Sequence, residues 1–211
     1  TLRDTVDFIN QRKLDELEGE QMLFQGNVQG EFPVNSLPTP MELILKIGAQ
    51  VLFVKNDKEK RWVNGTLGTI TGVDEEGYNY ITILLENGLE FDVEREVWSN
   101  MRYTFDETEK KIVEEEIGTY TQFPIRLAWA ITVHKSQGLT FSNVKIDFTG
   151  GVFAAGQTYV ALSRCKSLEG ISLNLPIRRG DIFVNRAVVD FARNYNDNAV
   201  IQSALSQSKA D

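Results

Sequence analysis

The chain has 211 residues, with 22 Lys and Arg against 30 Asp and Glu, a formal net charge of −8, and 42% hydrophobic residues. This balance is ordinary for a globular protein, and it excludes a disordered chain, a collagen-like chain and a disulfide-stapled mini-protein. The single cysteine, Cys165, cannot form an internal disulfide, which favours a reducing compartment such as the cytoplasm. No apolar run approaches the ~20 residues that a membrane span needs, so we expect no membrane partner.

The acidic total conceals an asymmetry along the chain. Residues 1–45 hold 3 basic and 8 acidic side chains, residues 46–117 hold 9 and 16, and residues 118–211 hold 10 and 6. Only the last segment is therefore basic. A locally basic segment is compatible with a polyanionic partner, which the acidic total alone would argue against.

The first part of the chain shows a helical pattern followed by strand patterns. Apolar spacing predicts a helix over residues 4–17, and prolines then favour an extended chain up to residue 40. From Gly48 on, alternating β-branched and aromatic residues between turn dipeptides such as Asn64-Gly65 predict short strands. These strands are expected at residues 49–56, 66–73, 78–86, 89–94, 101–107 and 110–117. Strands spaced so closely favour a small barrel or a curled sheet.

After Gly118 the pattern changes to alternating strands and helices. Residues 125–138 are predicted as an amphipathic helix or as a strand leading into a helix, residues 143–150 and 170–176 as strands, and residues 157–168 and 185–195 as helices. On the last helix, Ala187, Val188, Phe191 and Tyr195 are expected to face inward. Such alternation indicates an α/β fold with a parallel sheet, interrupted here by a small β domain.

Residues 130–141, AITVHKSQGLTF, concentrate polar donors. These donors are Thr132, His134, Lys135, Ser136, Gln137 and Thr140. Mixed positive and hydroxyl donors suit phosphate groups, and Gly138 lets the main chain approach a ligand closely or turn sharply. The structural alternative is a capped turn with a solvated lysine, and a lone histidine such as His134 is more often a surface or core residue.

Residues 155–170, AGQTYVALSRCKSLEG, form a second polar segment. On a helix, Tyr159, Leu162 and Cys165 would share one face, and Arg164 would lie on another. An exposed arginine is ordinarily a solvated charge of little energetic weight. An arginine aimed across a cleft at a transferring phosphate instead stabilises charge in the transition state. Spacing alone leaves both interpretations open.

The strings AWAITVHKSQGLTF and GQTYVALSRCKSLEG resemble motifs V and VI of the RecD-like branch of superfamily 1B DNA helicases, which includes the petite-integration-frequency helicases. Residues 37–70 are similar to the segment before the SH3-like insertion of these helicases, and residues 1–20 resemble the region around their motif IV. The resemblance implies a RecA-like domain of the P-loop NTPase type, the second of two. Residues 1–45 and 118–211 would form it, and residues 46–117 would be an SH3-like β-barrel insertion.

The resemblance also implies a role for each candidate residue. Arg164 would be the catalytic residue, an arginine finger that reaches the γ-phosphate of ATP. Under the arginine-finger role alone, Arg164→Ala would abolish ATP hydrolysis in the full-length protein and leave DNA binding largely unchanged. The nucleotide cleft would be lined by Gln137, Gly138, Thr140, Gln157 and Tyr159. Single-stranded DNA would be contacted by Thr132, His134 and Lys135. The whole enzyme would be a monomeric ATP-dependent 5′-to-3′ DNA helicase.

Two elements of such an enzyme are absent from the sequence. None of the 16 glycines is followed by lysine, so the Walker A loop that holds the phosphates is missing. No run of apolar residues leads into a paired Asp-Glu that could hold Mg²⁺. The resemblance implies that the N-terminal RecA-like domain of the same protein carries both. We therefore expect a C-terminal fragment that has no metal ligands of its own and is inactive alone.

Two other interpretations stay open. In one, the chain is a non-catalytic nucleic-acid or protein-binding module whose β-rich block makes the contacts. In the other, it belongs to a nucleotide-dependent switch or a transposition-associated ATPase built from the same two halves. Trp62, Tyr78 and Tyr80 could stack on bases, although aromatic residues in a small barrel are more often part of its core.

Overall fold

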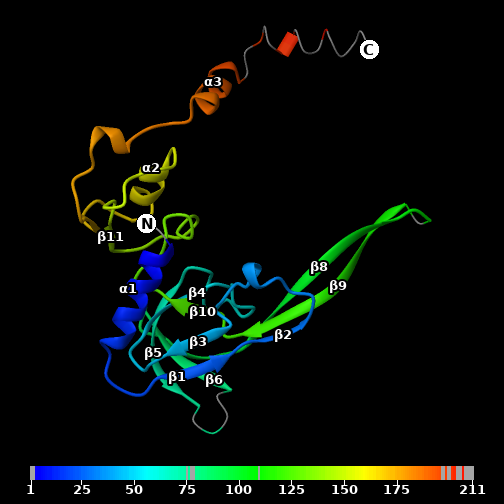
Figure 1. Cartoon of the computed structure of the whole chain (residues 1–211), viewed down its shortest axis with the longest axis vertical. Helices are drawn as coiled ribbons and strands as arrows, with labels where there is room; N and C mark the ends of the chain where they lie inside the picture. The colour runs from blue at the N-terminus through cyan, green and yellow to red at the C-terminus, as the bar shows by residue number, and fades with distance from the viewer. Residues whose placement is uncertain are drawn as a thin grey trace. The chain divides into compact units, whose positions relative to one another are not determined.

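The computed structural model describes residues 3–74, 76, 79–108, 110–195, 198, 201–202 and 206. The chain forms two compact units, which we call the N-terminal unit, residues 2–132, and the C-terminal unit, residues 133–211. Figure 1 shows the elements of each. The boundary between these units differs from the domain boundaries predicted near residues 45 and 118, which stay a prediction.

The N-terminal unit is rich in strands, as the sequence predicts. It contains α1 (Arg3–Asp15), β1 (Met22–Gln25), β2 (Asn27–Gly30), the 3-10 helix η1 (Val34–Ser36), β3 (Glu42–Leu45), β4 (Gln50–Phe53), β5 (Leu67–Val73), β6 (Tyr80–Leu85), β7 (Glu90–Glu94), β8 (Glu96–Asp106), β9 (Lys111–Gln122) and β10 (Ile125–Leu127). The helix predicted over residues 4–17 and the six strands predicted after Gly48 are confirmed, with shifted ends. Tyr78 lies outside the described residues.

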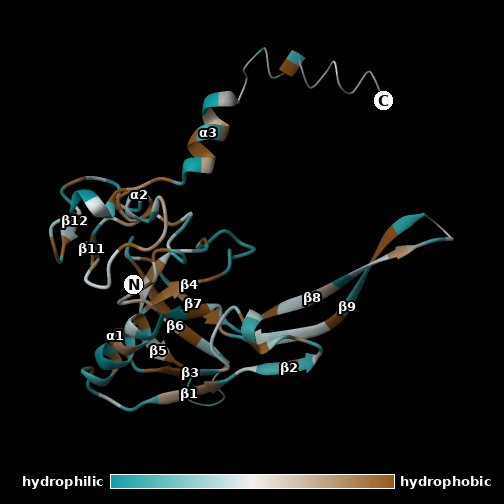
Figure 2. Ribbon diagram, turned by 45° about the horizontal axis from the view of Figure 1, so that its top comes forward, coloured by the Kyte–Doolittle hydropathy of each residue, from teal (hydrophilic) through white to brown (hydrophobic). Residues whose placement is uncertain are grey.

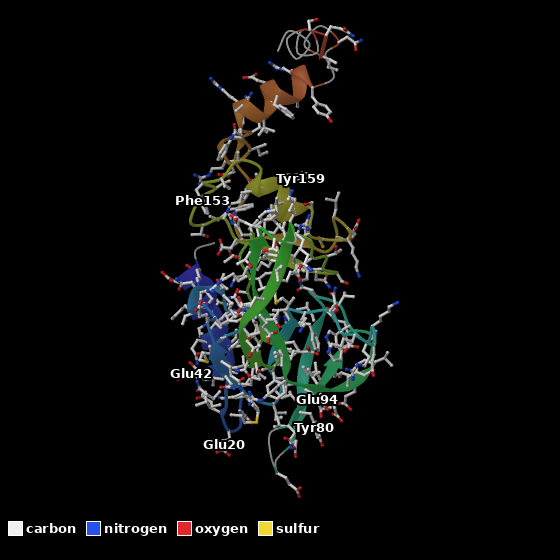
Figure 3. All side chains as sticks on the ribbon, turned by 90° about the vertical axis from the view of Figure 1, so that its right-hand side faces the viewer. Glu20, Glu42, Tyr80, Glu94, Phe153 and Tyr159 are labelled. Atoms are coloured by element: carbon white, nitrogen blue, oxygen red, sulfur yellow. The ribbon has the colours of Figure 1, made fainter. Side chains whose placement is uncertain are left out.

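Antiparallel pairing organises these strands. They form a five-stranded sheet in the order β10-β4-β5-β6-β7, a three-stranded sheet β2-β9-β8 and the pair β1-β3. Along β6, Ile81, Ile83 and Leu85 are buried in the core that also contains Leu14 of α1, and the intervening residues face outward. Tyr80 is the register partner of Glu94, and Figure 3 labels both at the surface.

Strands β1, β2 and β3 have no counterpart among the strands predicted from the sequence. β1 pairs with β3, whereas β2 pairs with β9, with Gly30 opposite Gly118. Each strand has 4 residues, too few to show a clear period of two. These strands are therefore specified by their partners rather than by local pattern.

β8 and β9 form a long hairpin that extends past the end of β2 (Figure 1). At the point where β2 ends, the main chains approach closely, because the N–H of Glu31 donates to the carbonyl of Ile117 at 2.8 Å. A Cβ atom at Gly118 would lie 2.3 Å from the carbonyl oxygen of Glu31, and Gly30 has a φ of +66°. Only glycine fits this contact.

The helix predicted within residues 125–138 is wrong, although the alternative of a strand at its start is confirmed by β10. After β10 the main chain is held by side-chain amides instead of helical hydrogen bonds. The Asn10 amide donates to the carbonyl of Ala130 at 3.0 Å and accepts from its N–H at 2.9 Å. The amide of Gln50 likewise donates to the carbonyl of Ala128 at 2.8 Å. The main-chain polar groups of this extended segment are therefore hydrogen-bonded without a helix.

The C-terminal unit is smaller and mixed. It contains β11 (Val144–Ile146), α2 (Gln157–Leu162), β12 (Ile171–Leu173), the 3-10 helix η2 (Arg179–Asp181) and α3 (Arg186–Asn194). β11 and β12 are parallel, and Ile146, Phe148 and Ala161 form the buried core beside them. The whole chain therefore has a mixed α/β fold with antiparallel sheets and a parallel pair, which agrees with the predicted class.

The predicted inward face of α3 is wrong. Val188, Phe191 and Tyr195 are exposed, and Ala187 is exposed as well. Figure 2 shows that apolar and polar positions alternate along this helix. Periodicity identifies such a helix correctly, but it carries no information about what covers the apolar face. None of the helices that the structure describes is long and apolar enough to cross a membrane.

Trp62 belongs to the core of the N-terminal unit and offers no surface for bases. Its ring stacks on Phe53 with centroids 4.5 Å apart, and the guanidinium of Arg61 lies 4.5 Å from its centroid. Arg61 is fixed by Asp57, whose carboxylate accepts its Nη2 at 2.8 Å and its Nε at 3.0 Å. These hydrogen bonds lower the pKa of Asp57 to about 2.

Replacing Asp57 tests how much its hydrogen bonds with Arg61 stabilise the N-terminal unit. Because the folded pKa lies below the ordinary 3.8, the carboxylate stabilises the fold above that value, and this stabilisation is lost as the pH falls towards 2. We expect Asp57→Asn to lower the free energy of unfolding at neutral pH by about 1–2 kcal/mol. Urea unfolding should show this difference shrinking in acid. Glu59→Gln, at an exposed carboxylate beside the same arginine, should have little effect, and a difference that is independent of pH would contradict the assignment.

Candidate functional site

The first polar segment folds into successive tight turns at the start of the C-terminal unit. The N–H of Ser136 donates to the carbonyl of Val133 at 3.2 Å, and the N–H of Leu139 donates to the carbonyl of Ser136 at 3.0 Å. Gly138 has a φ of +80°, in the left-handed region that strains other residues. The glycine thus allows the sharp turn that the sequence predicts.

Burial divides the residues of this segment into anchors and exposed groups. Ser136 and Leu139 are only 5% and 7% exposed, and the Ser136 hydroxyl donates to the carbonyl of Val133 at 2.7 Å. The exposed candidate residues are His134, Lys135, Gln137, Gly138 and Thr140. Two buried anchors therefore hold a turn whose polar side chains face outward.

Arg164 directly follows the C-cap of α2, and its guanidinium reaches back to this turn. Its Nε donates to the carbonyl of Val160 at 3.0 Å, and its Nη2 donates to the hydroxyl of Ser163 at 2.9 Å. Its Nη1 donates to the carbonyls of Ser136 at 3.4 Å and Leu139 at 3.2 Å. A guanidinium has five N–H donors, so one on Nη2 is left for a further acceptor.

The main chains of the two polar segments also meet. The N–H of Phe141 donates to the carbonyl of Arg164 at 2.8 Å, and the N–H of Lys166 donates to the carbonyl of Phe141 at 3.0 Å. Phe141 and Cys165 form a parallel β-bridge. The two segments singled out by sequence are therefore neighbours, and their contact does not depend on the Arg164 side chain alone.

The candidate residues on α2 separate into a buried one and an exposed one. Gln157 is 5% exposed, and its Oε1 accepts the N–H groups of Phe153 at 3.1 Å and Ala154 at 3.2 Å. Tyr159 is 74% exposed, and Figure 3 labels it at the surface together with Phe153. Gln157 therefore orders the loop before α2, whereas Tyr159 presents its ring to solvent.

The structure groups the predicted DNA-binding residues only in part. His134 and Lys135 share the exposed turn, whereas Thr132 is the half-buried last residue of the N-terminal unit. Within the described residues, no group of three or more His, Cys, Asp or Glu side chains could hold a metal ion.

Sequence analysis misses the roles of two serines. The sequence places Ser136 among the polar donors, but it is a buried anchor whose carbonyl accepts Arg164. Ser163 has no role in the sequence-based site, and its hydroxyl orients the guanidinium. Its position next to Arg164 is the available signal, although a hydroxyl beside an arginine is too common to be specific.

Replacing Gln157 tests its structural role. Gln157→Leu removes the buried acceptor of two main-chain N–H groups, those of Phe153 and Ala154, so we expect the free energy of unfolding to fall by about 1–3 kcal/mol. Thermal or urea unfolding of the chain measures this. Gln137→Leu makes the same replacement at an exposed glutamine and should change stability by less than about 0.5 kcal/mol. Equal effects at both positions would show that the buried acceptor is unimportant.

Comparisons with known proteins relate the chain to one family, although no protein-family model matches it. It is 36% identical over 169 residues to the ATP-dependent DNA helicase Pif1 of Bdellovibrio bacteriovorus, which covers 78% of this chain and 36% of the relative. It is 37% identical over 176 residues to the ATP-dependent DNA helicase PIF1 of Homo sapiens, which covers 81% of this chain and 26% of the relative.

Solved structures point to the same family. Unliganded Pif1 from Bacteroides sp matches with a TM-score of 0.83 and 42% identity over 94% of this chain and 45% of that one. Bacteroides Pif1 in complex with ADP-AlF3 and single-stranded DNA matches with a TM-score of 0.71 and 42% identity over 94% of this chain and 44% of that one. The chain thus spans less than half the length of these relatives. With both polar motif segments in contact and this similarity over most of its length, the chain belongs to the Pif1 family of ATP-dependent DNA helicases.

Proposed function

We propose that the chain is the part of an ATP-dependent 5′-to-3′ DNA helicase that supplies the arginine finger, Arg164, and part of the track for single-stranded DNA. The observation that carries this proposal is the contact between the Arg164 guanidinium and the turn that presents His134 and Lys135. A guanidinium that can bind phosphate is thereby hydrogen-bonded to a turn rich in hydrogen-bond donors. Bacteroides Pif1 has been solved with ADP-AlF4 and with single-stranded DNA, which supports ATP and DNA as ligands.

In this proposal, residues 1–45 and 118–211 form the second RecA-like domain, and residues 46–117 form an SH3-like insertion. The five-stranded antiparallel sheet supports a small β domain, and the β11-β12 pair supports a parallel α/β part. β10, at Ile125–Leu127, completes the antiparallel sheet by pairing with β4. The sheet of the proposed insertion therefore also uses residues beyond 117.

The remaining parts of the proposed enzyme lie outside this chain. We propose the N-terminal RecA-like domain of the same protein as the partner that holds the ATP phosphates and the Mg²⁺ ligands. We further propose a monomer in the cytoplasm, where the lone Cys165 would stay reduced.

The donor chemistry of the C-terminal unit fits a nucleotide phosphate. The exposed Gln137 amide and Thr140 hydroxyl can donate, and Gly138 carries no side chain that would block the main chain. Tyr159 offers an exposed ring. The remaining N–H on Nη2 of Arg164 can form a charge-assisted bond to the γ-phosphate. Gln157 would contribute by ordering the loop rather than by touching the nucleotide.

Two tasks fall to the residues of this chain when ATP supplies the transferable phosphoryl group. Arg164 would stabilise the negative charge that develops on the γ-phosphate. Thr132, His134 and Lys135 would hold the DNA backbone through salt-sensitive contacts. Because both RecA-like domains would hold the strand, their closing and opening would move it by one step.

Removal of the arginine side chain tests the catalytic assignment. In the complete protein, we expect Arg164→Ala to lower DNA-stimulated ATP hydrolysis by about 10³-fold or more, the usual value of an arginine finger. Phosphate release in the presence of single-stranded DNA measures this. The control is Arg193→Ala, at an exposed arginine on α3 that pairs with Asp190 at 4.0 Å. Equal activity in the Arg164 variant and the wild type would remove this residue from the mechanism.

The DNA track has its own test. The double variant His134→Ala, Lys135→Ala should bind single-stranded DNA more weakly, and the salt dependence of its affinity should be shallower by about 0.7 for each phosphate that is no longer bound. Titration at several salt concentrations by fluorescence anisotropy gives the slope. Lys145→Ala removes another exposed lysine of the same unit and should leave the slope unchanged. An unchanged slope in the double variant would exclude a phosphate contact.

A binding module is the alternative function, and the hairpin favours it. Tyr103 pairs with Glu114 and Phe105 pairs with Ile112, so these side chains share one face, and Tyr103, Phe105 and Ile112 are exposed. An apolar face flanked by carboxylates suits a protein surface better than a phosphate backbone. Under this alternative, Arg164→Ala would change no measurable activity.

A further inference from the structure

We propose that Arg164 has a second role, as a positioning residue that clamps the turn at residues 136–139 and so keeps the DNA-contacting side chains in place. This inference rests on the proposed function, in which His134 and Lys135 contact DNA. Unlike the arginine-finger role, this positioning role would operate without bound nucleotide.

The acceptors of the clamp are the two places where the turn is anchored. Nη1 of Arg164 donates to the carbonyls of Ser136 and Leu139, which are the buried residues of the turn. The exposed Gln137 and Gly138 lie between them. The planar guanidinium therefore holds the main chain on both sides of the exposed residues Gln137 and Gly138.

The other side of the guanidinium is fixed by α2. Nε donates to the carbonyl of Val160, and Nη2 donates to the hydroxyl of Ser163. That hydroxyl is itself oriented, because it donates to the same Val160 carbonyl at 3.0 Å. Ser163 thus holds the guanidinium in the orientation that meets the turn.

The number of donors couples the two proposed roles. Four of the five N–H groups are used by the clamp, and two parallel N–H groups are needed for a bidentate phosphate contact. Bidentate binding of the γ-phosphate would therefore release at least one clamp bond. Since coupling between binding sites is reciprocal, DNA bound on the turn would in the same way change the affinity of Arg164 for phosphate.

The clamp can be removed without separating the two segments. The N–H of Phe141 bonds to the carbonyl of Arg164, and the N–H of Lys166 bonds to the carbonyl of Phe141. Both contacts are made by main-chain atoms, which Arg164→Ala retains. The variant therefore isolates the action of the guanidinium.

The experiment compares the complete wild-type protein with Arg164→Ala and Arg164→Lys, without nucleotide, in two measurements. Amide hydrogen exchange should become faster at residues 134–139 in both variants, with the amide of Phe141 still protected. Affinity for single-stranded oligothymidine should fall by about fivefold to tenfold in both, the scale of about one ordinary hydrogen bond. Lysine keeps the charge but lacks the planar fork, so it should not restore the clamp.

Ser163 supplies a milder pair of variants. Ser163→Ala removes one acceptor and should produce smaller changes of the same kind, whereas Ser163→Thr keeps the hydroxyl and should behave as the wild type. Arg193→Ala is the matched control on α3 and should change neither measurement.

Two results would overturn the clamp. Unchanged exchange and unchanged nucleotide-free affinity, together with abolished ATP hydrolysis, would leave Arg164 as an arginine finger only. A fall in affinity with unchanged exchange would mean that Arg164 touches the DNA itself. If the wild-type protein bound no DNA, the proposed function and the DNA role of the clamp would both fail, whereas unchanged exchange would contradict only the clamp.

Discussion

The site depends on one planar cation that is bonded on both sides. The guanidinium of Arg164 joins the last turn of α2 to the carbonyls of two buried residues in a neighbouring turn, through four hydrogen bonds to neutral oxygens. Because these acceptors are neutral, an ionised phosphate would be a stronger partner for the guanidinium than any of them. The arrangement leaves one N–H of the arginine able to donate to an anion.

Neutral amide side chains have a comparable role in the N-terminal unit, where strands end without a regular partner. Asn10 satisfies both main-chain groups of Ala130. Gln122 is fully buried, donates to the carbonyl of Phe24 at 2.8 Å and accepts the N–H of Phe123 at 3.0 Å. Main-chain groups are thereby paired at the irregular joints between sheets, without the desolvation cost of a buried charge.

Sequence-based prediction is more accurate where the interacting residues are close together along the chain than where they are far apart. β5, β6 and β7 pair with their chain neighbours, so alternation and turn dipeptides are sufficient to predict them. β2 pairs with β9, which lies far along the chain, and no local pattern reveals such a partner. At the site, the motifs identify Arg164, but its clamp is invisible in sequence because its acceptors on the turn are carbonyls, which every residue has. The domain boundaries and the roles of the site residues stay predictions.

The contact between Gly30 and Gly118 sets the direction of the hairpin through main-chain atoms. It lies at the base of the hairpin, where Arg102 also forms a salt bridge with Glu31 at 2.8 Å. The side chains beyond this contact, such as those of Tyr103, Phe105 and Ile112, are exposed and do not take part in it. Substitutions at these exposed positions would therefore change the surface that the hairpin presents, and with it the partners it could contact, without changing the direction of the hairpin.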